Sequence, residues 1–276
     1  MINKLRNKQK TSLRRRLREA VLRGKIHREY ICPAGKKKDE TNTQYIQRLR
    51  ETSAADQFIE VTAKDKKYYV SFGVPGPIVT KLGTFFMVPA EVVGGEWGVH
   101  YCLFYPDFGK LKTKKRIALR IGSGCYSGMV LGDTTCDCTQ QFRAAQEQCI
   151  KNGSGMLMEI PSQDGRGWGE YKMAVQRIMA ELDSNTIQAA SSFYGHEHDI
   201  DRRTYDEAAI ILKALGFGPR HVLDLATNNP FRIKAFRDFG FKIGETIPTK
   251  HKTNDKRLSK NIRAKLDYWK RHGQGL

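Results

Sequence analysis

Three cysteines in a short stretch constrain this chain more than any other feature, because a shared ligand would force their side chains together. Ten residues separate Cys125 from Cys136, and Asp137 alone separates Cys136 from Cys138. Two cysteines separated by a single residue do not easily form a relaxed disulfide, but both can reach one metal ion. Thiolate is a preferred zinc ligand, and three protein ligands leave the fourth position for water, as in catalytic sites. The spacing therefore predicts a zinc centre.

Spacing alone leaves two other interpretations of these thiols open. A structural zinc site would need a fourth ligand, and Cys102, Cys149 and His196 are possible donors. The thiols could also be unrelated buried side chains, a common state for free cysteine. No apolar signal sequence precedes the six cysteines, so we expect a cytoplasmic protein whose thiols stay reduced.

The net charge of +19 indicates an anionic partner, such as nucleic acid, a membrane surface or a phosphorylated small molecule. Much of the excess lies in dense basic runs over residues 1–28 and 248–271. We therefore predict a basic N-terminal extension over residues 1–75 and a basic helical tail over residues 248–276. No run approaches about 18 apolar residues, so neither a transmembrane helix nor a membrane partner is expected.

The basic ends suggest one function of a different class, a non-catalytic nucleic-acid-binding protein. Single-strand binding surfaces usually stack bases on aromatic side chains, and residues 1–29 contain none. Nucleic acid is therefore a possible partner but not the favoured one.

Between residues 58 and 121 the pattern is that of β-structure. Short runs of β-branched and aromatic residues are separated by glycine turns, which is typical of an antiparallel section. The predicted strands are Phe58–Thr62, Tyr68–Phe72, Thr84–Val88, Val99–Phe104 and Arg116–Ile121.

Beyond Cys138 strands and helices alternate, which favours an α/β layer with some parallel pairing. The predicted strands are Met156–Ile160, Val222–Ala226 and Phe241–Ile243. The predicted helices are Thr139–Asn152, Gly169–Leu182, a helix to Leu215 opened by the capping box Thr204-x-x-Glu207, a helix from Pro230 to Phe239 capped by Asn229, and Lys256–Arg271. A basic helix is also predicted within residues 1–30. The predicted fold class is therefore α+β or α/β, an antiparallel β-section followed by an alternating strand–helix layer.

Three further motifs place polar residues beside predicted helix starts. The run Gln163–Gly169 follows a strand, and such a glycine-rich turn can direct backbone N–H groups toward an anion. Asp201 and Arg203 precede one helix, and the run Ala226–Arg232 spans the start of another. Each motif also has an ordinary structural interpretation: a tight turn with a surface arginine, a solvated loop, and helix capping by Asn229.

Taken in order, the motifs resemble GTP cyclohydrolase II. The resemblance rests on Cys-x10-Cys-Asp-Cys, then Gln-Asp-Gly-Arg, then Asp-x-Arg before a helix, then Leu-Ala-Thr-Asn-Asn-Pro, and it covers roughly residues 76–247. It implies that residues 76–247 form a catalytic domain that opens the imidazole ring of GTP and releases formate and pyrophosphate, the entry point of riboflavin synthesis. Members of this family are dimeric, so the resemblance also implies a homodimer.

The resemblance implies roles for individual residues. Cys125, Cys136 and Cys138 would bind one zinc ion per chain and activate water, and magnesium would accompany the triphosphate. Asp201 corresponds to the proton acceptor. Arg203 corresponds to the residue that acts on the α-phosphate, as a nucleophile or, given its basicity, by electrostatic stabilisation alone. The residues that would contact the base and phosphates are Arg120, Gln141, Asp164, Arg166, Thr186, Thr227 and Arg232.

The chain departs from the family around the reacting ring. The run Gly122–Cys125 reads Gly-Ser-Gly-Cys where the family has His-Ser-Glu-Cys, and Asp164 replaces a glutamate. Arg177 falls at the position of a catalytic tyrosine, and Arg232 replaces a lysine. An alternative is therefore a diverged hydrolase with an altered substrate or product. Such an enzyme would act on another nucleotide or nucleobase, as in uracil catabolism, or would stop at ring opening without releasing formate.

Overall fold

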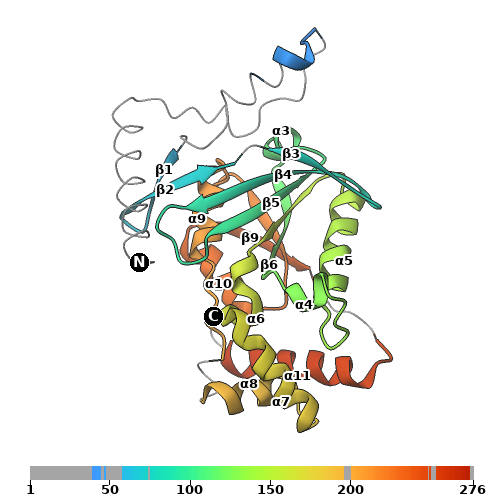
Figure 1. Cartoon of the computed structure of the whole chain (residues 1–276). Helices are drawn as coiled ribbons and strands as arrows, with labels where there is room; N and C mark the ends of the chain where they lie inside the picture. Colours follow the sequence, from blue (N-terminus) through green and yellow to red (C-terminus); the bar gives the residue numbers. More distant parts are fainter. Residues whose placement is uncertain are drawn as a thin grey trace, which may run out of the picture.

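Figure 1 shows a computed structural model of the chain. The structure describes residues 39–44, 47, 58–73, 75–195, 200–247, 249 and 253–273. The basic helix predicted within residues 1–30 and the possible ligand His196 lie outside the described residues.

The strands in the described part of the chain form one mixed sheet. Its order is β1-β2-β4-β5-β7-β6-β8-β9, and β3 pairs with β4 away from this path. The strands are β1 (Phe58–Ala63), β2 (Lys66–Phe72), β3 (Gly76–Thr80), β4 (Gly83–Val92), β5 (Val99–Tyr105), β6 (Arg116–Gly122), β7 (Gly155–Glu159), β8 (Val222–Ala226) and β9 (Lys242–Ile247).

The sheet changes from antiparallel to parallel pairing at β7. The pairs β1–β2, β2–β4, β4–β5 and β5–β7 are antiparallel. By contrast, β6 is parallel to both β7 and β8, and β8 is parallel to β9. This arrangement confirms the predicted fold class. The strands β1 and β2 fall within the predicted N-terminal extension, and they pair into this same sheet.

Helices cover the sheet and extend beyond its lower end in Figure 1. They are α3 (Phe108–Lys112), α4 (Tyr126–Met129), α5 (Cys138–Lys151), α6 (Asp164–Gly167), α7 (Lys172–Glu181), α8 (Thr186–Tyr194), α9 (Asp206–Ala214), α10 (Pro230–Asp238) and α11 (Lys256–His272), with 3-10 turns η3 (Pro161–Gln163) and η4 (Gly169–Tyr171). None of the helices in the described ranges is long and apolar enough to span a membrane.

Successive side chains along a strand point to opposite faces, and this alternation builds a core on each side of the sheet. Phe104 of β5 belongs to the large core that includes the buried face of α9. Its neighbour Leu103 faces the other way and packs with Leu157, Ala145 and Cys149, the last two from α5. A third cluster joins α7, α8 and α11 beyond the sheet. The site described below lies between this helical layer and the strand ends.

Most predicted elements are confirmed to within a few residues, but the structure corrects two details of the helical layer. The helix predicted over Gly169–Leu182 is divided into η4 and α7. Helix α8 was not predicted, although its start carries a clear signal. Asn185 accepts hydrogen bonds from the backbone N–H groups of Ile187 and Gln188, and the Gln188 side chain completes a capping box. The strand β3 and the short helices α3 and α4 also lie where no element was predicted.

The capping box predicted at Thr204 and Glu207 is wrong. Helix α9 starts after Tyr205, and no side chain caps it. Glu207 instead accepts hydrogen bonds from the backbone N–H groups of Glu96 and Trp97, at 2.6 and 3.2 Å. Thr204 accepts one from the Trp97 indole at 2.7 Å. Contacts more than 100 residues away in sequence thus outcompete the local capping pattern.

The cap predicted for the following helix is confirmed. The Asn229 side chain accepts a hydrogen bond from the backbone N–H of Phe231 at 2.9 Å, with Pro230 at the first helical position. This cap fixes the start of α10 directly beyond the end of β8.

Candidate metal centre and active site

One pocket lies beyond the carboxyl ends of the parallel strands. Strands β6 and β8 are neighbours, and the chain continues from β6 to β7 on one side of this pair and from β8 to β9 on the other. Ligands of open α/β sheets bind at such a point. The floor is formed by the ends of these strands, at Gly122, Glu159 and Thr227. Residues of α7, α8 and α11 form the opposite wall. The empty space, including the open mouth, is about 1280 Å³, which is ample for a nucleotide.

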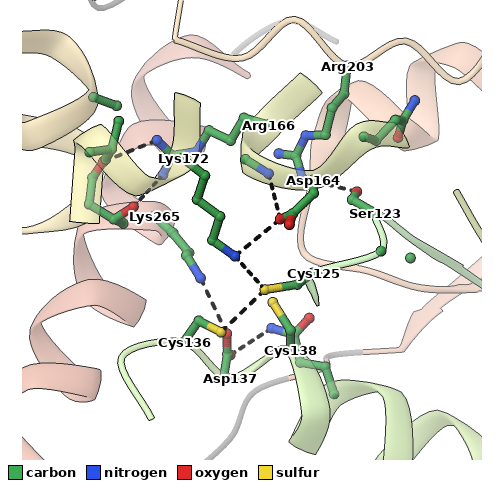
Figure 2. A pocket seen from close by; sticks show the side chains of 18 of the residues that line it. Ser123, Cys125, Cys136, Asp137, Cys138, Asp164, Arg166, Lys172, Arg203 and Lys265 are labelled. Atoms are coloured by element: carbon green, nitrogen blue, oxygen red, sulfur yellow. Dashed lines mark hydrogen bonds and ion pairs between the residues drawn. The ribbon is translucent and has the colours of Figure 1, made fainter. Parts of the chain in front are cut away.

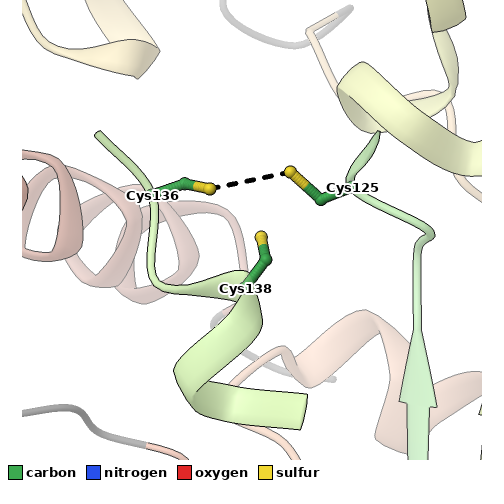
Figure 3. A group of neighbouring side chains, drawn as sticks. All are labelled: Cys125, Cys136 and Cys138. Atoms are coloured by element: carbon green, nitrogen blue, oxygen red, sulfur yellow. Dashed lines mark hydrogen bonds between the residues drawn. The ribbon is translucent and has the colours of Figure 1, made fainter. Parts of the chain in front are cut away.

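The three predicted metal ligands meet in this pocket. Cys125 follows β6 and caps α4, Cys138 begins α5, and Cys136 lies in the loop before it. Their sulfur atoms all lie within 4.8 Å of one another, and those of Cys125 and Cys136 are 3.6 Å apart (Figure 3). Chain segments that are separate in sequence thus direct three thiols to one point.

Gly128 makes this convergence possible. A Cβ atom at this position would lie 2.5 Å from the sulfur of Cys136 and 3.2 Å from that of Cys125. The first distance is shorter than van der Waals contact allows, so any side chain would push the thiols apart. The glycine of α4 is therefore a steric requirement of the cluster.

The thiol geometry fits zinc. Zinc–sulfur bonds of ~2.3 Å in tetrahedral geometry put neighbouring sulfurs ~3.8 Å apart, close to the separation of Cys125 and Cys136. Within the described residues no fourth histidine, cysteine or carboxylate joins the cluster. Cys149 packs in the apolar core beside α5, where burial raises its thiol pKa to about 12. A position open to a non-protein ligand suits catalytic metal chemistry.

Lys172 and Asp164 line the metal cluster, as Figure 2 shows. The Lys172 ammonium donates to the sulfur of Cys125 at 2.8 Å and to Asp164 at 3.1 Å. Burial lowers the pKa of Lys172, but the bonds to Cys125 and Asp164 outweigh it and raise this pKa above its ordinary value. Sequence reasoning missed Lys172, because a lysine at the start of a helix is usually a solvated side chain.

Asp201 and Arg203 form a bidentate ion pair beside the pocket. The guanidinium donates to the two carboxylate oxygens at 2.8 and 2.5 Å. The side chains are 9% and 12% exposed. Burial raises the pKa of Asp201, but the Arg203 charge outweighs this and holds the pKa below its ordinary value. Burial likewise lowers the pKa of Arg203, and the pair with Asp201 reverses this and raises it. Both groups are therefore charged at neutral pH.

Ser123 joins two arginines on the pocket floor. Its hydroxyl accepts hydrogen bonds from Arg203 and from Arg232, both at 3.2 Å. Arg232 is buried against the ring of Tyr205, 5.0 Å from its centroid, and its Nε has no partner in the described chain. Two guanidinium groups held around one hydroxyl form a site suited to a phosphate group.

Arg166 is half-buried and lines the pocket, which argues against an exposed surface arginine. It has a positive φ of 63°, and its guanidinium donates to the backbone carbonyl and the hydroxyl of Thr186, at 3.2 and 3.4 Å. Burial lowers the pKa of Arg166 to about 10. Two predicted substrate contacts, Arg166 and Thr186, thus hold each other at the pocket wall.

Arg120 and Gln141 connect the end of β6 to Asp137, the residue between Cys136 and Cys138. Arg120 donates to the Gln141 side chain at 2.9 Å, and Gln141 in turn donates to Asp137 at 2.6 Å. Asp137 is also 3.4 Å from the ammonium of Lys265, which comes from α11 (Figure 2). The residue between two predicted ligands is therefore held from both sides of the pocket.

The basic tail contributes directly to this site. Asn261 of α11 is fully buried, accepts a hydrogen bond from the backbone N–H of Thr186 at 2.9 Å and donates to the carbonyl of Thr135 at 2.8 Å. Tyr268 and Trp269 line the pocket one helical turn beyond Lys265. The sequence predicts a basic helical tail here, and its helix α11 forms the wall opposite the strands.

Most of the predicted site residues meet in one pocket. Arg177, which stands at the position of the family's tyrosine, does not reach it. The pocket is lined by Arg120, Cys125, Cys136, Cys138, Gln141, Asp164, Arg166, Thr186, Arg203, Thr227 and Arg232, and Asp201 supports it through Arg203. Arg177, at the family's tyrosine position, has an 81% exposed side chain that pairs with Glu181. Tyr171 is also exposed and outside the pocket.

Comparison with known proteins finds relatives of this chain. The sequence profile described as GTP cyclohydrolase II matches residues 77–248. The chain is 34% identical over 141 residues to a GTP cyclohydrolase-2 of Shewanella baltica, covering 51% of this chain and 66% of that one. It is 32% identical over 146 residues to the riboflavin biosynthesis protein RibBA of Aquifex aeolicus, covering 53% and 34%. The matches thus span slightly less than two thirds, and about one third, of these relatives' lengths.

A solved structure of RibBX, a two domain 3,4-dihydroxy-2-butanone 4-phosphate synthase from A. baumannii, gives a TM-score of 0.33 at 16% identity. The likeness covers 64% of this chain and 40% of that one, and nothing in the assignment of the site rests on it.

Proposed function

The chain belongs to the GTP cyclohydrolase II family, and on that premise we propose that it hydrolyses the imidazole ring of GTP at a zinc centre, releasing formate and pyrophosphate. The observation that carries the proposal is the meeting of three thiols and several enclosed arginines in one pocket. Such a reaction needs a Lewis acid beside the ring and positive charge beside the phosphates.

Cys125, Cys136 and Cys138 would hold the metal. When bound, zinc supplies a Lewis acid that makes water a better nucleophile. Gly128 keeps the three thiols close enough to share it, and Lys172 donates to Cys125 from the pocket side. The remaining work of binding and orienting the nucleotide falls to the chain's own polar side chains.

Arg203, Arg232 and Ser123 are proposed to bind the phosphate at which pyrophosphate leaves. Because the pair with Asp201 raises the pKa of Arg203, the guanidinium stays protonated at neutral pH. A protonated guanidinium has no lone pair for attack, so we propose an electrostatic role rather than a nucleophilic one. Asp201 orients Arg203 and is the nearby acceptor for a proton released during hydrolysis.

Magnesium would accompany the triphosphate, since hard cations prefer oxygen ligands. The product would be the diaminopyrimidine from which riboflavin is made, in line with the name of the Aquifex relative. We further propose a homodimer, for which light scattering should give twice the chain mass of 31.5 kDa.

The proposal is tested by incubating zinc-loaded protein with GTP and magnesium. Loss of the purine absorption band, with formate and pyrophosphate released in equal amounts, is the expected result. The Cys136→Ser variant removes one thiol and should abolish all three signals. Absorption change without formate would instead indicate arrest after ring opening, and no change in any signal would reject GTP as substrate.

One observation favours a second candidate, hydrolysis of a different nucleotide or nucleobase. Asp164, which takes the place of the family's glutamate, already accepts hydrogen bonds from the backbone N–H groups of Tyr126 and Gly165 and from Lys172, at 2.7–3.1 Å. A carboxylate held by three donors of its own chain is poorly placed to recognise a guanine amino group. A screen of other nucleotides by absorbance would distinguish this candidate.

A further inference from the structure

Two charged side chains on the pocket floor have polar atoms that no residue in the described part of the chain satisfies. Arg120, at the end of β6, is 6% exposed, and its Nε and Nη1 lack partners. Glu159, at the end of β7, is 8% exposed, and its Oε1 lacks one. Arg120 and Glu159 interact as opposite charges, but burying polar atoms without hydrogen-bond partners is unfavourable, so these atoms are candidate ligand contacts.

The Glu159 carboxylate is held in one position by its surroundings. Its Oε2 accepts a hydrogen bond from the backbone N–H of Gly124 at 3.3 Å. Its Oε1 lies where the Cβ of Gly122 would be, only 1.8 Å from that ideal atom. The glycine at position 122 thus makes room for a carboxylate from the neighbouring strand.

Glu159 places a carboxylate beside two glycines of the loop that follows β6. The two glycines, Gly122 and Gly124, stand where the family carries histidine and glutamate, and Glu159 fills the space next to them. Asp164, by contrast, has its oxygens occupied by Tyr126, Gly165 and Lys172. Of these two carboxylates, Glu159 alone has an oxygen with no hydrogen-bond partner in the described chain.

We propose that Glu159 is the carboxylate that recognises the base, accepting a hydrogen bond from a ring N–H while Arg120 donates to the adjacent carbonyl. A donor beside a carbonyl is the lactam edge, which guanine and uracil carry and adenine and cytosine lack. This inference rests on the proposed function only in that the ligand is a nucleotide. It assigns Glu159 as a specificity-determining residue, with lactam-bearing bases as the substrate class.

The test measures dissociation constants by calorimetry on the full chain in magnesium buffer, with zinc removed so that GTP is not hydrolysed during the titration. The probes are inorganic triphosphate, which lacks a base, and the four nucleotides GTP, UTP, ATP and CTP. The readout is the dissociation constant of triphosphate divided by that of the nucleotide. A ratio above 1 means that the nucleoside adds to binding. The wild-type ratio should exceed 1 for GTP, UTP or both, and should stay near 1 for ATP and CTP.

Two variants perturb Glu159 independently. Glu159→Gln removes the charged acceptor with little change in shape, and should lower the wild-type ratio about 10- to 100-fold, the usual effect of losing a hydrogen bond to a charged group. Gly122→Ala keeps the glutamate but displaces its carboxylate, so it should lower the ratio similarly. The double variant should lose no more than either single one. Glu181→Gln, on the exposed face of α7, is the matched control and should leave the ratio unchanged.

The outcomes separate this inference from the proposed function. If Glu159→Gln weakens triphosphate and nucleotides equally, or leaves the ratio unchanged, Glu159 does not recognise the base. If no nucleotide binds more tightly than triphosphate, or if ATP and CTP bind as tightly as GTP and UTP, the inference is also overturned. If GTP is not hydrolysed but the UTP ratio falls in Glu159→Gln, the inference stands and the proposed substrate fails.

Discussion

Replacing Asp201 by asparagine should destabilise the folded chain more than most single substitutions would. The carboxylate is 9% exposed and accepts two hydrogen bonds from Arg203, at 2.8 and 2.5 Å. Asparagine retains the shape but leaves the guanidinium without its counter-charge, in a pocket that also holds Arg166 and Arg232. Breaking a buried ion pair by removing one partner costs about 3–5 kcal/mol. For a domain of this size the thermal midpoint should fall by about 6–20 °C.

The pH dependence of this stability difference gives a second, independent test. Burial raises the pKa of Asp201, but Arg203 outweighs burial and holds this pKa below its ordinary value. A group with a depressed folded-state pKa stabilises the fold above its unfolded-state pKa of about 3.9, and this contribution is lost as pH falls through the folded-state pKa. The stability difference between wild type and Asp201→Asn should therefore be constant from pH 7 to about 5 and shrink below about pH 4.

Urea unfolding followed by circular dichroism measures both the loss of stability at pH 7 and its change with pH. Glu181→Gln, which breaks the exposed pair with Arg177, is the control and should change stability little. A loss below about 1 kcal/mol for Asp201→Asn at pH 7 would contradict the buried-pair argument, since exposed pairs contribute that much. A difference that grows as the pH falls below 4 would refute the sign of the linkage.

Three further predictions follow from contacts around the pocket. Gly128→Ala should weaken zinc binding about 10- to 100-fold, since its methyl group would lie 2.5 Å from the sulfur of Cys136. Competition with a chelator measures the zinc affinity, and an unchanged affinity would contradict the steric role of Gly128. Asn261→Ala should destabilise the fold by about 1–3 kcal/mol by leaving the partly buried N–H of Thr186 and carbonyl of Thr135 unpaired. Urea unfolding measures this loss, and a smaller loss would show that water replaces the asparagine. Arg177→Ala should leave nucleotide turnover unchanged because the side chain is exposed, and a loss of turnover would mean that it reaches the substrate.

The metal cluster and the strand pattern were predictable because their signals are local. Only Asp137 separates Cys136 from Cys138, and a strand such as Val222–Ala226 is mostly apolar, with Asp224 as its one charged residue. The N-cap at Asn229 was predictable for the same reason. In each case the determining interaction lies within a few residues, so the sequence pattern specifies it.

The remaining features depend on distant partners. Glu159 lies at the end of an apolar strand, and only the parallel pairing with β6 brings it against Gly122. The capping pattern at Thr204 failed because Trp97, far away in sequence, takes its hydroxyl. Asn261 joins the start of α8 to the loop before Cys136, at Thr186 and Thr135, which lie 75 and 126 residues before it. No local pattern encodes such contacts, so they appear only once the sheet and α11 are in place.

The central claim is that GTP hydrolysis depends on one metal ion held by Cys125, Cys136 and Cys138. The most direct test strips the protein of metal, adds zinc in measured fractions of an equivalent, and records the initial rate of GTP loss at each step. The claim predicts a rate that rises linearly to one zinc per chain and then stays constant. Full activity without zinc, or no GTP loss with one equivalent bound, would contradict it.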